Sequence, residues 1–289
     1  MPRSPLHQRI LDWYAREARD LPWRERGTSP WGVLVSEVML QQTPVVRVEP
    51  AWRQWMSRWP VPAALAGSAP GDAIHAWGRL GYPRRALRLH AAATAMVERH
   101  GGDVPEMPTD LLALPGVGTY TAAAVSAFAF GRRTAVVDTN VRRVFARAVN
   151  GAAQAAPSLT RAELDLASEL LPDDANDARR WSVAVMELGA LVCLARSPRC
   201  PSCPVRDLCA WQWASQPVLA WHGPAVSGRH PRGVESDEET RQSGRGGRRM
   251  VHRRRPARPL PRQPGHGRSR GTLVRQQIPA AGSLEGART

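Results

Sequence analysis

The residues with the most specific chemistry are four cysteines that stand close together late in the sequence. Their spacing is Cys193-x6-Cys200-x2-Cys203-x5-Cys209, and the chain contains no other cysteine. Four thiolates this close can converge on one metal centre, and both four-iron clusters and structural zinc sites use such a ligand set. Zinc sites usually contain two close pairs of cysteines, whereas only one pair is close here. The spacing therefore favours an iron–sulfur cluster over zinc, and it argues against dispersed disulfides.

A second candidate for chemistry is Glu37, which is the single charged residue in the apolar segment 33–40. A carboxyl group buried in such a helix loses its hydration, so its pKa should rise towards neutrality. A general acid that works at physiological pH needs a pKa in that range. A glutamate at the edge of a helix, paired with an arginine, would give the same pattern. The residues alone leave both interpretations open.

Two further motifs are suited to binding an anion or capping a helix. In LPGVGTYTA (114–122), Gly116 and Gly118 permit positive φ and carry no side chain, so backbone N–H groups can face an anion at the next helix. A plain turn between two helices would have the same composition. Asp138 precedes the amphipathic segment 139–149, where we expect it to be the N-cap.

The elements that position these residues are predicted to be helices, which makes the fold class all-α. Apolar residues recur at helical spacing through most of the first 190 residues, and proline, glycine and aspartate separate the segments. The segment 134–137 could be extended, but it is too short to indicate a sheet. The expected helices cover residues 6–18, 31–42, 45–58, 84–99, 119–130, 139–149, 160–170 and 176–190.

The motifs together resemble the endonuclease III superfamily of DNA glycosylases, which bind DNA with a helix–hairpin–helix. The cysteine spacing and LPGVG are the superfamily's signatures, and SEVMLQQT around Glu37 resembles the adenine DNA glycosylases of the MutY type. The resemblance extends in order over residues 6–212. Its other matching motifs are LPWR (21–24), LGY (80–82), VVDTNVRRV (136–144) and MELGALVC (186–193).

The resemblance implies a two-lobed protein with a [4Fe-4S] cluster bound by the four cysteines. One lobe would be a six-helix barrel, residues 23–134, which includes the helix–hairpin–helix. The other would combine residues 1–22 with 135–212 as an iron–sulfur cluster domain, whose exposed arginines would face the DNA backbone. Residues 223–289 are rich in arginine and have no aromatic residue, so we expect them to be disordered.

The resemblance also implies a role for each candidate residue. Glu37 would protonate an extruded adenine, and Asp138 would stabilise the positive charge that develops on the sugar. Tyr120 would lie near the sugar, and the two hairpin glycines would hold a phosphate. The remaining implied site residues are Trp23, Arg24 and Leu40 in the adenine pocket, and Gln42 and Tyr82 at the mispair. Val183 stands where relatives often have a glutamine or glutamate directed at adenine.

The residue at position 120 indicates the subclass. Relatives that also cleave the DNA strand have a lysine there, which forms a Schiff base with the sugar. Here the residue is Tyr120, and the chain contains no lysine. The sequence therefore predicts a monofunctional hydrolase that removes adenine mispaired with 8-oxoguanine or guanine. An endonuclease III-like pyrimidine glycosylase with lyase activity and a non-catalytic iron–sulfur DNA-binding protein are the alternatives.

Charge and composition fit a nucleic-acid partner without identifying one. The formal net charge is +15, and all 40 basic Lys and Arg residues are arginines. A basic chain favours polyanions, although most of the excess charge falls after residue 225. No signal peptide or membrane span is evident, so we expect a cytoplasmic monomer that binds double-stranded DNA. Many relatives have a second, Nudix-like domain that recognises 8-oxoguanine. We do not expect residues 223–289 to form one, so the resemblance implies adenine removal without implying a preference for 8-oxoguanine over guanine.

Overall fold

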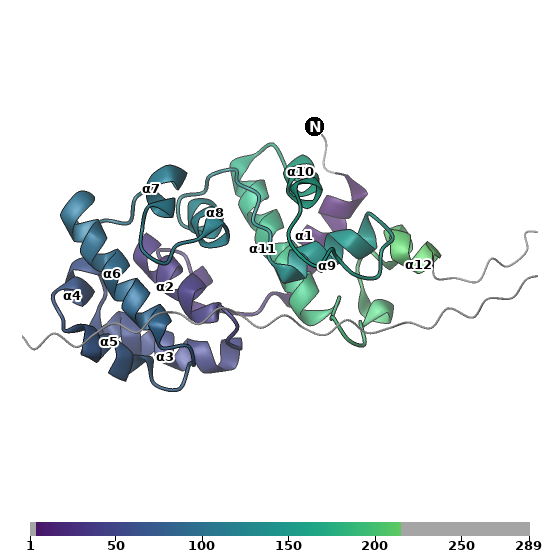
Figure 1. The fold of residues 1–289 in the computed structure, drawn as a ribbon. Helices are drawn as coiled ribbons and strands as arrows, with labels where there is room; N and C mark the ends of the chain where they lie inside the picture. The colour runs from purple at the N-terminus through teal and green to yellow at the C-terminus, as the bar shows by residue number, and fades with distance from the viewer. Residues whose placement is uncertain (1–3, 215–289) are drawn as a thin grey trace, which may run out of the picture. The chain divides into compact units, whose positions relative to one another are not determined.

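The computed structural model describes residues 4–214, which lie within one compact unit, Met1–Ala225 (Figure 1). Every regular element in this range is helical, as the sequence predicts, and 134–137 forms no strand. The predicted tail, 223–289, lies outside the described residues. The longer elements are α1 (Pro5–Glu17), α2 (Pro30–Leu40), α3 (Val45–Arg58), α6 (Arg84–Arg99), α8 (Thr119–Phe128), α9 (Thr139–Ala148), α10 (Arg161–Glu169) and α11 (Ala175–Leu191).

Several short helices complete the fold, and the sequence analysis did not predict them. Each has too few residues for a helical repeat of apolar positions to be recognised. They are the α-helices α4 (Pro62–Ala66), α5 (Pro70–Trp77), α7 (Pro108–Leu112) and α12 (Ala210–Ala214), and the 3-10 turns η1 (Pro22–Arg24), η2 (Cys200–Ser202) and η3 (Arg206–Leu208). None of the helices within residues 4–214 is long and apolar enough to cross a membrane.

The first of two large hydrophobic cores forms around α2. Nine residues of α2 are buried, and the helices α3, α6 and α8 pack against α2. Ser29 caps its first turn by accepting a 3.1 Å hydrogen bond from the Gly32 amide, and Pro30 occupies the position where a missing N–H costs nothing. The four tryptophans Trp31, Trp55, Trp59 and Trp77 are almost fully buried in this core. Glu37 is therefore held by a helix that is largely buried in this apolar core.

The second core joins the N-terminal helix to the later part of the chain. Helix α1 packs on α11, and α11 packs on α9 (Figure 1). Ile10 and Trp13 from α1 share this core with Phe145 from α9 and Trp181 from α11. Cys193, Cys203 and Cys209 also contact it, so the cysteine segment is anchored on the same core.

Candidate active site and metal centre

A large open cavity lies between elements of the two cores and has a volume of about 1300 Å³. Its wall includes Val183 and Met186 from α11, together with residues from η1, α2, α8 and the start of α9. The sequence-predicted residues that line it are Trp23, Arg24, Glu37, Leu40, Gln42, Tyr82, Tyr120 and Asp138. The structure thus brings together eight candidates that are spread over more than a hundred positions in the sequence.

Glu37 lies at the wall of this cavity with only 7% of its surface exposed. Its Oε2 accepts a 3.0 Å hydrogen bond from the hydroxyl of Tyr120. Burial raises the pKa of Glu37 to about 7, although the Tyr120 hydrogen bond and the positive charge of Arg24 act in the opposite direction. The predicted rise in pKa is thereby confirmed, and the carboxyl can hold a proton near neutral pH.

Tyr120 lies in the first turn of α8 and faces both carboxylates. Burial is the main cause that raises the pKa of its hydroxyl well above the ordinary value, and the negative charges of Glu37 and Asp138 raise it further. The hydroxyl therefore stays protonated and serves as a hydrogen-bond donor.

Asp138 is the N-cap of α9, as predicted. Its Oδ1 accepts a 2.7 Å hydrogen bond from the Val141 amide, and its Oδ2 accepts one of 2.7 Å from Asn140 Nδ2. Burial raises the pKa of Asp138, while these hydrogen bonds and the nearby Arg143 oppose the rise. Besides capping α9, Asp138 also borders the cavity.

A chain of side chains connects Asp138 to the cysteine segment. Asn140 Oδ1 accepts a 2.7 Å hydrogen bond from Arg143 Nη2, and Arg143 Nε donates one of 2.7 Å to the Cys193 carbonyl. The same guanidinium donates to the Gly189 carbonyl at 2.7 Å. A Cβ at Gly189 would lie 2.7 Å from the Asn140 Cβ, so α9 and α11 approach this closely because residue 189 is glycine. The sequence analysis did not identify Asn140 or Arg143.

The four cysteines influence one another electrostatically, so they are gathered in one place. Cys193 Sγ accepts a 3.5 Å hydrogen bond from Arg147, and Cys200 Sγ accepts one of 3.1 Å from Gln212. Such donors are typical of thiolates that carry the negative charge of an iron–sulfur cluster.

The donor set has the chemistry of an iron–sulfur site, because four cysteine thiolates are the usual ligands of a four-iron cluster. The four cysteines therefore fit the [4Fe-4S] cofactor that the sequence analysis expects.

Glu187 is a site residue that the sequence analysis missed. Its side chain is fully buried and accepts hydrogen bonds from Arg19 Nε at 2.6 Å and from Arg24 Nη2 at 3.0 Å. Burial alone would raise the pKa of Glu187, but these two arginines lower it to about 2. The ion pairs hold Arg24 at the cavity wall. A signal was available, because Glu187 is the only charged residue in the mainly apolar segment 181–193, much as Glu37 is in 33–40.

The two hairpin glycines, Gly116 and Gly118, have different backbone conformations, which corrects the expectation for Gly118. Gly116 has a φ of +80°, and a Cβ there would lie 2.6 Å from the Arg88 Cβ. Gly118 has a φ of −95° and a ψ of 178°, so it does not adopt positive φ. It is the N-cap of α8, where an extended residue starts the helix. Its backbone lies at the surface with open space above it, as close approach of an anion requires.

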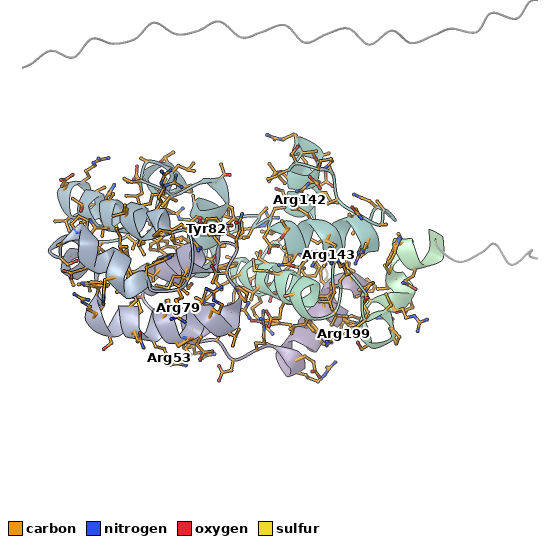
Figure 2. All side chains as sticks on the ribbon, turned by 60° about the horizontal axis from the view of Figure 1, so that its bottom comes forward. Arg53, Arg79, Tyr82, Arg142, Arg143 and Arg199 are labelled. Atoms are coloured by element: carbon orange, nitrogen blue, oxygen red, sulfur yellow. The ribbon has the colours of Figure 1, made fainter. Side chains whose placement is uncertain are left out.

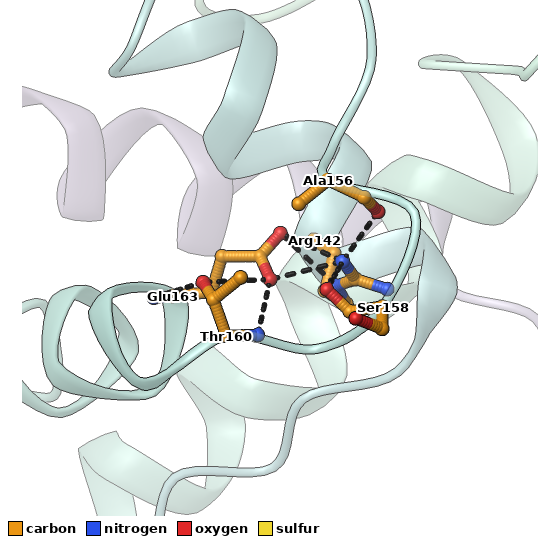
Figure 3. A network of polar contacts seen from close by, with 5 residues as sticks. All are labelled: Arg142, Ala156, Ser158, Thr160 and Glu163. Carbon is orange, nitrogen blue, oxygen red and sulfur yellow. Dashed lines mark hydrogen bonds and ion pairs between the residues drawn. The ribbon is translucent and has the colours of Figure 1, made fainter.

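Several arginines are exposed, among them Arg53, Arg79 and Arg199, which Figure 2 labels together with Tyr82. Arg196, Arg199 and Arg206 in the cysteine segment are all exposed, as a contact with the DNA backbone would require. Arg142, at the cavity wall, instead fixes the segment that follows α9. Its Nη2 donates to the carbonyls of Ala156 and Ser158 at 2.7 and 2.8 Å, and to Glu163 (Figure 3).

Family models match the two motif regions separately. Residues 35–169 match the HhH-GPD superfamily of base excision DNA repair proteins. Residues 193–209 match the iron–sulfur binding domain of endonuclease III.

Known proteins resemble the chain over more than two thirds of its length. It is 54% identical to the adenine DNA glycosylase of Mycobacterium tuberculosis H37Rv over 217 residues, which cover 75% of this chain and 70% of that protein. The human adenine DNA glycosylase is 41% identical over 208 residues, which cover 69% of this chain and 38% of the human protein.

Solved structures agree with this fold. A thermostable thymine-DNA glycosylase has a TM-score of 0.66 and 28% identity, with 72% of this chain and 95% of that chain covered. An endonuclease III–DNA complex has a TM-score of 0.61 and 22% identity over 72% of this chain and 94% of that chain, which supports the fold alone. Taken with the relatives and the family models, the chain belongs to the adenine DNA glycosylases, a family of iron–sulfur base-excision repair enzymes.

Proposed function

We propose that this enzyme hydrolyses the bond between adenine and deoxyribose where adenine is mispaired with 8-oxoguanine or guanine in double-stranded DNA. The observation that supports it most is the pair of carboxyl groups at one cavity, one held near neutral pKa and one fixed at a helix N-terminus. The base must leave the duplex to reach that cavity, because stacked bases are inaccessible to side chains.

In the proposed mechanism, the protonated Glu37 carboxyl donates its proton to a ring nitrogen of the extruded adenine. The glycosidic bond then breaks, and its electron pair leaves with the base. Asp138, as a carboxylate, stabilises the positive charge on the sugar. Water adds to the sugar carbon and loses a proton to the Glu37 carboxylate. The products are free adenine and an abasic site, and Glu37 is ready for another cycle.

The remaining cavity residues would recognise the base and its partner. Trp23 and Leu40 provide apolar surface for the adenine ring, and Arg24 provides a positive charge beside it. Val183 cannot donate or accept a hydrogen bond, so recognition of adenine would depend more on shape than in relatives with a polar residue there. Gln42 and Tyr82 would probe the opposite strand.

The metal centre would support DNA binding at a distance from the chemistry. The four cysteines would hold the [4Fe-4S] cluster, which when bound supplies a structural anchor for the surrounding loop. Arg196, Arg199 and Arg206 on that loop would contact phosphates. Each such contact releases counterions, so binding should weaken as salt increases.

We also propose the domain boundaries that the sequence suggests. Residues 23–134 would form the six-helix barrel, and 1–22 with 135–212 the cluster domain. The separate cores, one around α2 and one shared by α1, α9 and α11, support this division. The monomeric state and the cytoplasmic location stay predictions from the sequence.

The test is single-turnover incubation with duplexes that contain A:8-oxoguanine, A:G or A:T, followed by identification of the released base. The proposal predicts free adenine and an intact strand with an abasic site from the first two duplexes, and far less from A:T. Release of a pyrimidine, or no release by cluster-loaded protein, would refute it. Borohydride should trap no covalent adduct on abasic DNA. An adduct would support the lyase alternative instead.

A further inference from the structure

Two exposed residues at the cavity mouth have a strained backbone. Gln42 has a φ of 55° and Tyr82 a φ of 50°, and both lie in turns, one after α2 and one before α6. Such conformations cost a residue other than glycine on the order of 1 kcal/mol each and persist only where the surroundings enforce them. Some interaction must therefore hold both turns.

The side chain of Arg85 occupies the space between these turns. It lies in the first turn of α6 and is only 6% exposed. Its Nη1 donates to the carbonyls of Val38 and Met39 at 3.0 and 3.1 Å and also to that of Gln41. Its Nη2 donates to the carbonyls of Leu80 and Gly81 at 3.3 and 3.0 Å, and to the Thr43 hydroxyl at 3.0 Å. All six acceptors are neutral oxygens.

Each set of acceptors flanks one of the strained residues. Gln41 and Thr43 are the neighbours of Gln42, and Gly81 directly precedes Tyr82. Thr43 adds a direct link, because its buried hydroxyl donates to the Leu80 carbonyl at 3.1 Å. The Arg85 guanidinium also lies 5.4 Å from the centre of the Tyr82 ring.

The guanidinium additionally stabilises the end of α2. The last carbonyls of a helix lack intrahelical partners and carry partial negative charge, so a buried cation there is favourable. Val38 and Met39 directly follow Glu37 in that helix. Arg85 therefore links the two turns that contain Gln42 and Tyr82 to α2, the helix that carries Glu37.

We propose that Arg85 is a positioning residue that holds Gln42 and Tyr82 as one rigid unit against the C-terminal end of α2. This inference rests on the proposed function, because it assigns the unit to insertion at the mispair. Arginine is required because only a planar fork of donors reaches acceptors on both turns at once. Lysine would keep the charge but reach fewer of them.

The test compares Arg85→Lys and Arg85→Met with Arg99→Met, an exposed control on the same helix. We expect Arg85→Lys to lose at least ~10-fold in single-turnover adenine release, since small misplacements of positioning groups cost this much or more. Arg99→Met should match the wild type. Melting temperature and visible cluster absorbance will identify variants that fail to fold. Thr43→Val, which removes one link with little change in volume, provides a milder second variant with a smaller loss in the same direction.

A second readout separates positioning from general damage. In a Glu37→Gln background, which blocks excision, a fluorescent 2-aminopurine beside the opposite base reports unstacking. The background protein should raise the fluorescence, and adding Arg85→Lys should remove at least half of the rise. A folded Arg85→Lys and Thr43→Val with wild-type release and an unchanged fluorescence rise would overturn the inference. Failure of the wild type to release adenine would instead refute the proposed function.

Discussion

The Tyr120 hydroxyl donates a 3.0 Å hydrogen bond to Glu37 Oε2, in a setting where burial raises the pKa of Glu37 to about 7. The two effects have opposite signs. Burial disfavours the charged carboxylate, whereas the hydrogen bond favours it. Tyr120 therefore keeps the pKa of Glu37 from rising further, and the carboxyl is able to release its proton to a substrate.

The pH dependence of catalysis should reflect this balance. Because the general acid must be protonated, the single-turnover rate should fall as pH rises through about 7, approaching tenfold per pH unit. Tyr120→Phe removes the hydrogen bond that favours the charged form. The pKa of Glu37 should then increase, and the fall in rate should begin at a higher pH.

A pH–rate profile measured on both proteins is the appropriate experiment. Tyr14→Phe is a matched control, because it also removes a hydroxyl at the cavity wall and Tyr14 does not contribute to the pKa shift of Glu37. Its profile should match the wild type. A Tyr120→Phe profile that shifts to lower pH would contradict the assignment of the hydroxyl as a donor.

Asn140 should matter for catalysis because its side chain holds the Asp138 carboxylate. Asn140→Ala removes the 2.7 Å hydrogen bond to Asp138 Oδ2 and the bond that Arg143 donates to Asn140. A hydrogen bond to a charged group is worth about 1.5–3 kcal/mol, so we expect a loss of roughly 10- to 100-fold in rate. The visible absorbance of the cluster should persist, because Arg143 keeps its bond to the Cys193 carbonyl.

The exposed Asn150 offers a control on the loop after α9, and Asn150→Ala should leave the rate unchanged. Loss of the cluster in Asn140→Ala, rather than loss of rate alone, would indicate that the asparagine serves the metal centre. A wild-type rate would mean that Asp138 needs no orientation by its neighbour.

Glu187 should contribute to stability through its two arginines. Its pKa is lowered to about 2, so its contribution is present above the ordinary value of 4.5 and is lost as pH falls through about 2. Glu187→Gln leaves Arg19 and Arg24 without their carboxylate and should cost about 3 kcal/mol at pH 7. Chemical unfolding at pH 7 measures this loss, with the exposed Glu98→Gln as control. An unchanged free energy of unfolding would show that the ion pairs are dispensable.

The sequence predicted the parts of the site that depend on local pattern. The pattern around Glu37 allowed either a buried carboxyl or an ion pair at a helix edge, and the resemblance to the adenine DNA glycosylases favoured the catalytic role. Asp138 was predicted to be an N-cap because it precedes an amphipathic segment, and its role at the sugar came from the same resemblance. The longer helices follow from apolar periodicity in the same way, and the cluster ligands follow from their spacing.

The remaining features depend on contacts between distant segments, which local pattern does not encode. Arg85 lies in an ordinary run of arginines in the sequence, and only folding brings it to the carbonyls of two turns. Arg143 likewise gains its distant partners, the carbonyls of Gly189 and Cys193, only through folding. Gly118 was expected to permit positive φ, but the structure uses it as an extended N-cap.

Glu37 is the proton donor to adenine in the proposed mechanism, and every later step depends on it. The direct measurement is the single-turnover rate of adenine release from an A:8-oxoguanine duplex by Glu37→Gln, with Glu98→Gln as the matched control. Glutamine keeps the shape of the side chain but has no acidic proton, so we predict a loss of at least ~100-fold, while the control retains the wild-type rate. A folded, cluster-loaded Glu37→Gln protein that releases adenine as fast as the wild type would contradict the account.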